Sequence, residues 1–265
     1  MKRARRRIGI GKAPRKAVLV GALALALALV SGAAALVIQV GDIVLDADGG
    51  FTPTTLPRHE DAPITIHGSG KVSTISGELP PIVETLTIEY DKHGSVQTEG
   101  LPVCTAAKLQ STTVAAARRA CPGAIVGEGR GSAIVAFPES KQIRISSPIT
   151  IFNGPRLHGD DTVLAHAYTT VPVPTTFIVP VVIERIHHGV YGYRTIAKIP
   201  KIAGGAGHPI SGSLKIGRRW TYKGVKHSYL NARCETGHLQ AKVEVTLTDT
   251  TVLRGEFIRP CKARD

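Results

Sequence analysis

The chain has 265 residues, with 33 lysines and arginines against 20 aspartates and glutamates, and a formal net charge of +13. Eight of the basic residues lie before residue 17, and without them the balance is 25 − 20 = +5, which is ordinary for a domain of this size. The composition therefore gives no support for a nucleic-acid partner. It leaves open a diffuse, salt-screened attraction to anionic envelope polymers.

The N-terminus has the pattern of an export signal. The eight basic residues, with no acid among them, are followed by an uncharged run over residues 18–38. Such an order keeps the basic stretch in the cytoplasm and places the remainder of the chain outside it. Small residues at 33–35 predict a signal peptide over residues 1–35 and a mature domain over residues 36–265. A retained membrane anchor over about residues 1–40 is the alternative, because roughly 20 helical residues span a bilayer.

The mature chain begins with a predicted strand over residues 36–45. Asp46 and Asp48, followed by Gly49, have the spacing that opens a calcium loop. Position 12 of that loop would be Pro57 instead of a glutamate, so we favour a simple Asx-type turn over a calcium site.

Alternation of apolar and polar residues then dominates the chain. Residues 85–90 alternate, and the turn residues 91–94 predict a hairpin with residues 95–99. The glycine-rich residues 127–131 predict another hairpin, leading into a strand at 132–137. Prolines 172, 174 and 180 place residues 171–180 at a sheet edge. Further strands are expected at residues 143–152, 162–171, 177–186, 191–199, 212–216, 220–233, 239–247 and 252–258. The pattern predicts a mainly β protein: an antiparallel β-sandwich or jelly-roll-like domain.

One segment predicts helix within this β pattern. Residues 105–120 favour a helix, and Arg118 and Arg119 suit the negative end of its dipole. Residues 111–113 offer a new N-cap that would divide the helix into two. Cysteines on either side make this segment a short, disulfide-bounded helical insert.

The four cysteines all fall in the exported part. An even number in an oxidising compartment predicts two disulfides over free thiols, and the lack of a C-x-x-C spacing argues against zinc. Of the three pairings, we favour the local one, Cys104 with Cys121 and Cys234 with Cys261. In the chain-entropy model each would contribute about 3 to 4 kcal/mol.

A search for reactive motifs gives no catalytic, cofactor-binding or metal-ligating residue, and no cofactor is expected. Four of the ten histidines, His158, His166, His187 and His188, lie closest in sequence. On a strand, His187 and His188 would point to opposite faces, and no carboxylate or cysteine stands at ligand spacing beside them. A Ser-His-Asp triad assembled from distant strands stays open, because geometry alone defines a triad.

Residues 36–135 resemble uncharacterised extracytoplasmic β-rich proteins of actinobacteria. The resemblance rests on Gly100-Leu-Pro-Val-Cys104, on the spacing to Cys121 and on Ala124-Ile-Val-Gly127. It implies the first disulfide and a mature domain that starts before Gly41. It implies no activity, and no functional residue is carried over from it.

These patterns predict an exported, disulfide-stabilised, non-enzymatic binding or structural protein, secreted or held in the cell envelope, with an unknown ligand. Its partner would be an envelope polymer or another envelope protein, and it would touch the membrane only through an uncleaved N-terminal segment. A secreted hydrolase with an unrecognised site and a carrier of envelope lipids are the alternatives. With only 12 aromatic residues, an extended sugar-stacking platform is not expected.

Overall fold

The computed structural model describes residues 35–265, which form one compact unit. The predicted signal peptide, except for Ala35, lies outside the described residues. Within the described range, no helix combines the length and the apolar character needed to cross a membrane. All the clusters of buried apolar residues described below belong to this unit, so we expect it to fold without the preceding segment.

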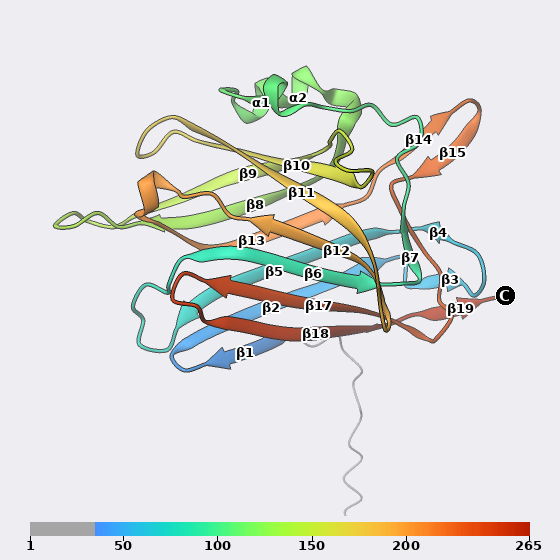
Figure 1. Cartoon of the computed structure of the whole chain (residues 1–265), viewed down its shortest axis with the longest axis horizontal. Coiled ribbons are helices and arrows are strands. Elements are labelled where there is room, and N and C mark those ends of the chain that lie inside the picture. The colour runs from blue at the N-terminus through green and yellow to red at the C-terminus, as the bar shows by residue number, and fades with distance from the viewer. Residues whose placement is uncertain (1–34) are drawn as a thin grey trace, which may run out of the picture. The chain divides into compact units, whose positions relative to one another are not determined.

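Twelve strands form one antiparallel sheet, in the order β1-β2-β5-β13-β8-β9-β10-β11-β12-β6-β17-β18 (Figure 1). Their bounds are β1 Leu36–Val40, β2 Ile43–Thr52, β5 Thr65–Thr74, β6 Val83–Asp91, β8 Ile125–Val135, β9 Ile143–Asn153, β10 Asp161–Thr169, β11 Thr175–His188, β12 Tyr191–Lys198, β13 Gly207–Ile216, β17 His238–Leu247 and β18 Val252–Pro260.

The sheet curls until its first and last strands pack together. A side chain at Gly255 of β18 would collide with Leu36 and Ile38 of β1, so the glycine lets the two edges approach. Apolar side chains of β2 and β5, such as Leu45 and Val72, pack against those of β17 and β18. A second cluster, formed by Val126, Ile151, Val163, Ile183, Tyr229 and Leu101, fills the space inside β8–β11. The expected mainly β, sandwich-like antiparallel domain is confirmed, with both layers supplied by one continuous sheet.

The helical insert covers the outer face of β9 and β10. It consists of α1 (Ala106–Leu109) and α2 (Val114–Ala120), and the Thr113 hydroxyl accepts a hydrogen bond from the Ala116 N–H at 3.2 Å. Ile151 of β9 points into the interior, while the next residue, Phe152, packs outward beneath Leu109. Both the helical insert and its division at residues 111–113 are confirmed.

Three short sheets, two further short helices and two disulfides complete the described structure. Cys104 pairs with Cys121 and Cys234 with Cys261, with Cα–Cα distances of 5.8 and 5.9 Å, so the local pairing is confirmed. A further short helix spans Pro122–Ala124 and another Ala203–Gly205. The short strands are β3 Thr55–Pro57 with β19 Lys262–Arg264, β4 Ala62–Pro63 with β16 Leu230–Ala232 and β7 Gly94–Val96, and β14 Arg219–Tyr222 with β15 Val225–Ser228.

The predicted hairpin around residues 91–94 is wrong. β6 pairs with β12 and β17, whereas β7 pairs with β16. The Asp91 carboxylate accepts a hydrogen bond from the His93 N–H at 2.9 Å, which stabilises the turn. The chain turns here as expected, but it leaves the large sheet instead of folding back on its own strand.

Two glycine-containing turns also prove to be strand interiors. Residues 127–131 lie within β8, where a side chain at Gly129 would collide with the Ser213 carbonyl of β13. Asp46, Asp48 and Gly49 lie within β2, so neither an Asx turn nor a calcium loop forms there. These glycines permit close approach between strands, which a turn-based interpretation does not consider.

Elsewhere, two expected strands are each divided into shorter ones. Residues 36–45 form β1 and the start of β2 around a turn at Gly41, and residues 220–233 form β14, β15 and β16. Pro172 and Pro174 lie in the loop before β11. Pro180 lies within β11, opposite Leu164 of β10, and β12 begins to pair with β11 only at Val182. β11 is an interior strand between β10 and β12, so the edge prediction is wrong for the strand as a whole, and the proline is accommodated because only β10 pairs with β11 at Pro180.

Candidate functional site

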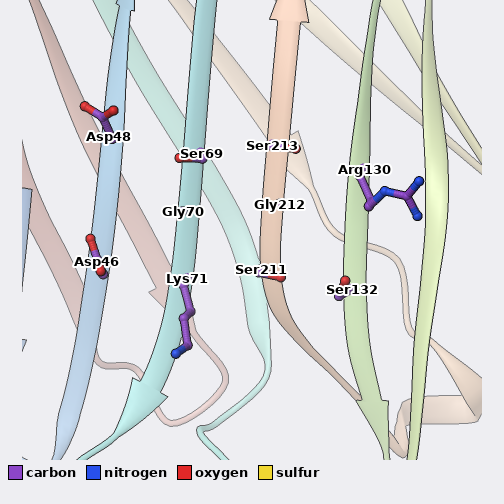
Figure 2. Close-up of a pocket in the computed structure, with 10 residues that line it drawn as sticks. All are labelled: Asp46, Asp48, Ser69, Gly70, Lys71, Arg130, Ser132, Ser211, Gly212 and Ser213. Atoms are coloured by element: carbon purple, nitrogen blue, oxygen red, sulfur yellow. The ribbon is translucent and has the colours of Figure 1, made fainter. Parts of the chain in front are cut away.

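The outer face of β2, β5, β13 and β8 carries a wide, open hollow (Figure 2). One row of cross-strand partners runs Asp46, Lys71, Ser211, Ser132, and the next runs Asp48, Ser69, Ser213, Arg130. We call these eight residues the serine face. Hydroxyl groups occupy its middle, with carboxylates on the β2 side and a guanidinium on the β8 side (Figure 2).

Strand alternation explains why these side chains point outward. On β2, Leu45 and Ala47 are buried in the core, which turns Asp46 and Asp48 to solvent. The same alternation on β5 buries Val72 and exposes the neighbouring lysine. The sequence pattern that builds the core thus also builds this polar face.

The central hydroxyls of the serine face have no hydrogen-bond partner in residues 35–265. No hydrogen bond between described residues involves the side chains of Ser69, Ser211 or Ser213, and all three residues are exposed. At the borders, Asp48 pairs with Arg259 at 2.8 Å, and Ser132 donates to Ser146 at 3.3 Å. The middle of the face can therefore exchange bound water for ligand hydroxyls.

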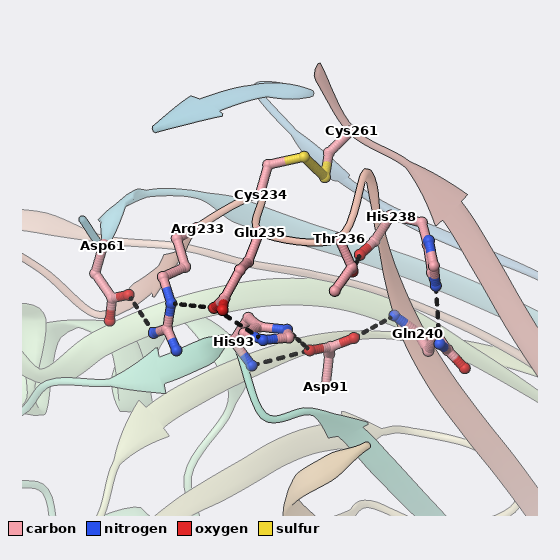
Figure 3. A network of polar contacts seen from close by, with 10 residues as sticks. All are labelled: Asp61, Asp91, His93, Arg233, Cys234, Glu235, Thr236, His238, Gln240 and Cys261. Atoms are coloured by element: carbon pink, nitrogen blue, oxygen red, sulfur yellow. Dashed lines mark hydrogen bonds and ion pairs between the residues drawn. A yellow bond between two sulfur atoms is a disulfide. The ribbon is translucent and has the colours of Figure 1, made fainter. Parts of the chain in front are cut away.

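A second polar constellation lies near the Cys234–Cys261 disulfide, with His93 and Asp91 buried and three partly exposed charged residues around them (Figure 3). His93 is 6% exposed, its Nδ1 lies 2.7 Å from Asp91 Oδ1, and its Nε2 lies 3.1 Å from Glu235 Oε2. Arg233 donates to Glu235 at 3.2 Å and to Asp61 at 3.2 Å. We call these five residues the His93 network.

The His93 network is saturated by its own hydrogen bonds. Both ring nitrogens of His93 face carboxylates, so neither is available to a substrate proton. The second carboxylate oxygen of Asp91 accepts the Gln240 N–H at 3.0 Å. The hydrogen bond from Arg233 lowers the pKa of Glu235, which keeps that carboxylate ionised. The arrangement connects the β6–β7 turn to β16 and β17 and is structural in character.

The histidines singled out from the sequence do not converge. His158 lies exposed in the loop after β9, and His187 and His188 are exposed at the end of β11. His188 Nδ1 approaches Glu89 Oε2 at 3.8 Å. His166 is fully buried beneath the insert, and its Nε2 lies 3.1 Å from the Thr112 carbonyl. Among residues 35–265, no group of three or more His, Cys, Asp or Glu has the arrangement of a metal site.

An acidic residue buried on the outer face of β6 forms a further polar pairing. Glu89 is 7% exposed and accepts two hydrogen bonds from Arg194, at 3.1 and 2.8 Å. Nearby, the Tyr191 hydroxyl donates to Glu256 at 3.3 Å. Burial, together with the charge of Glu256, raises the pKa of Tyr191 to about 12, so this phenol stays protonated. Both bonds from Arg194 go to Oε1 of Glu89, whereas Oε2 is buried without a hydrogen-bond partner among the described residues.

Sequence reasoning missed both the serine face and the His93 network. The members of the network come from residues 61, 91, 93, 233 and 235, and only the fold brings them together. A local signal existed in Asp91-x-His93, since an aspartate two residues before a histidine can cap its turn. For the serine face, the signal is the alternating run Ser211-Gly-Ser213, which places two hydroxyls on one side of a strand.

Comparison with known proteins adds no assignment: no family model matches the chain, and no curated protein matches it.

Proposed function

We propose that this chain is an exported, non-enzymatic binding protein whose serine face holds a hydroxyl-rich polymer of the cell envelope. The observation that carries the proposal is the contrast between the two polar constellations. The groups of the His93 network are already bonded to one another, whereas the side chains of Ser69, Ser211 and Ser213 form no hydrogen bond with the described residues. Disulfides are typical of oxidising compartments, which supports an extracytoplasmic location.

The chemistry of the serine face fits a glycan bound through hydrogen bonds. Serine hydroxyls donate and accept, Asp46 accepts, and Lys71 and Arg130 donate, which matches the mixed character of sugar hydroxyls. No aromatic side chain lines the hollow, so stacking does not contribute. Affinity at one repeat would be low, and a polymer would gain from contacting the long face at several points. The relationship to extracytoplasmic proteins of actinobacteria is part of this proposal.

The interior of the sheet gives less support to a lipid carrier. Aliphatic side chains from facing strands pack against one another in the two main clusters. The hollows over β5 and β13 are open and lined largely by polar residues and glycine. A binding role at the surface therefore accounts for more of the described structure.

The proposal is tested with the domain from Leu36 to Asp265 and a purified cell-wall glycan. Soluble glycan fragments should shift the backbone amide resonances of β5, β13 and β8. A double variant, Ser211→Ala with Ser213→Ala, should weaken binding about ten- to thirtyfold, because each lost hydrogen bond is worth roughly 1 kcal/mol.

A matched control removes two exposed hydroxyls elsewhere, at Ser140 and Thr170, and should bind as the wild type does. Shifts confined to other strands, or equal losses in both double variants, would contradict the assignment of the serine face.

A further inference from the structure

The positive charge of the folded domain is concentrated in one part of the chain. Between Glu184 and Glu235 the sequence has ten lysines and arginines and no acid. The other residues after position 35 carry 15 basic and 20 acidic groups, so the surplus of +5 arises entirely from this segment. Three of the ten basic residues, Arg219, Lys223 and Lys226, lie on the hairpin β14–β15. We call it the basic hairpin.

The basic hairpin stands apart from the large sheet as a two-stranded unit (Figure 1). Its two-residue loop, Lys223-Gly224, has φ angles of +50° and +80°, as a type I′ turn requires. Arg219, Lys223 and Lys226 are exposed. None of them forms an ion pair with a carboxylate of the described residues. Their charge is therefore available to a partner.

Aromatic residues on the opposite face hold the basic hairpin in place. The Trp220 ring stacks on His227 with centroids 5.5 Å apart, and its Nε1 donates to the Glu99 carbonyl at 3.0 Å. The Tyr222 ring packs on Gly100, where a side chain would collide with it. The cations are thus presented on a fixed support, which reduces the entropy lost on binding.

We propose that the basic hairpin is a docking surface for a linear polyanion of the cell envelope. Charge complementarity identifies the partner's chemistry: anionic groups repeated along a chain can contact Arg219, Lys223 and Lys226 in succession. The site is separate from the serine face, since the two share no residue, so either proposal can fail alone.

A hydrated polymer fits the basic hairpin better than a membrane surface does. Membrane-binding segments insert large apolar side chains beside their cations. Here Trp220 and Tyr222 turn toward the body of the domain, and Val225, 59% exposed, is the large aliphatic residue at the tip. The outward surface is therefore mainly cationic.

The test measures binding of inorganic polyphosphate to the domain from Leu36 to Asp265. The triple variant R219Q/K223Q/K226Q should bind about tenfold or more weakly. The slope of log affinity against log salt should fall by about 2, since each cation lost releases roughly 0.7 counterion fewer. A control triple variant, K141Q/R144Q/K201Q, changes the net charge equally at three exposed positions and should retain wild-type affinity and slope.

Three results would overturn the proposal: no binding of polyphosphate by the wild type, equal losses in both triple variants, or binding to phosphatidylglycerol vesicles without binding to polyphosphate. Circular dichroism and thermal unfolding verify that each variant is folded. If the hairpin triple variant unfolds, the single variant K226Q, which lies opposite Thr221 on the other side of the hairpin from the Trp220–His227 pair, should still show a weaker affinity and a lower salt slope.

Discussion

Two buried histidines of this domain have opposite surroundings. His93 lies between the carboxylates of Asp91 and Glu235, whereas His166 lies among hydroxyls, a backbone carbonyl and apolar side chains. The sequence did not indicate a structural role for either histidine, because that role depends on burial in the folded domain. The first is expected to matter through its hydrogen bonds and the second through its response to pH.

We expect His93→Gln to lower the free energy of unfolding by about 3 kcal/mol. The substitution leaves the buried Asp91 carboxylate with fewer partners and removes the connection to Glu235. Urea unfolding at neutral pH measures the change. His187→Gln, at an exposed position, should stay within about 0.5 kcal/mol of the wild type. A loss below 1 kcal/mol at position 93 would show that the network is dispensable.

His166 should make the domain less stable in mild acid. Burial lowers its pKa, and the hydrogen bond to Thr112 only partly opposes this effect. The unfolded chain therefore takes up the proton first as the pH falls. Stability is unaffected by this residue above about pH 6.5 and declines below it, by at most about 1.4 kcal/mol per pH unit.

Urea unfolding at pH 7.5 and 5.5 tests the expectation for His166. The wild type should lose more stability on acidification than His166→Leu does, because the variant lacks the titrating group. His187→Leu serves as the control and should keep the wild-type pH dependence. Identical pH dependence in all three proteins would refute the role of His166.

At the scale of elements, each of the two helices of the insert has a threonine at its N-cap, but only one of these threonines makes a capping hydrogen bond. Thr113 accepts a hydrogen bond from Ala116 at 3.2 Å, whereas the Thr105 side chain makes no capping bond. Thr113→Ala should therefore cost about 1 kcal/mol, and Thr105→Ala clearly less. Thermal unfolding of both variants at one pH compares them directly. Equal costs would mean that helix propensity, not the cap, determines the effect.

Sequence patterns predicted where the strands lie better than they predicted which strands pair with one another. The two-residue period located most strands because it reports burial on one face, which each strand carries in its own residues. Pairing depends on distant segments: β6 lies between β12 and β17, which no turn signal near residue 91 could indicate. The hairpin predicted at residues 127–131 was wrong for a related reason. Gly129 leaves room for the Ser213 carbonyl of another strand, and it does not mark a turn.

The same difference separates the disulfides, which were predicted, from the polar sites, which were not. Cys104 and Cys121 were paired correctly because only a helix-sized insert separates them. The His93 network joins residues more than 140 positions apart, and the serine face joins four strands. Such constellations depend on strand order, which the local sequence does not contain.

At the scale of the whole molecule, we expect the exported protein to begin at Leu36. The expectation comes from the small residues at 33–35, and β1 starts at Leu36 in the structure. Intact-mass spectrometry of protein recovered from the host measures the mature N-terminus. A full-length mass confined to the membrane fraction would contradict cleavage and favour the anchor.

The contact between β1 and β18 also has a kinetic consequence. The strand β1 must wait for one near the end of the chain, because its Leu36 and Ile38 pack beside Gly255 of β18. Contacts between such distant segments make folding slow. During that wait, the backbone edge of β1 is exposed to proteases and to pairing with other chains. The chain must therefore be available almost to its last strand before β1 gains the protection of its packing against β18.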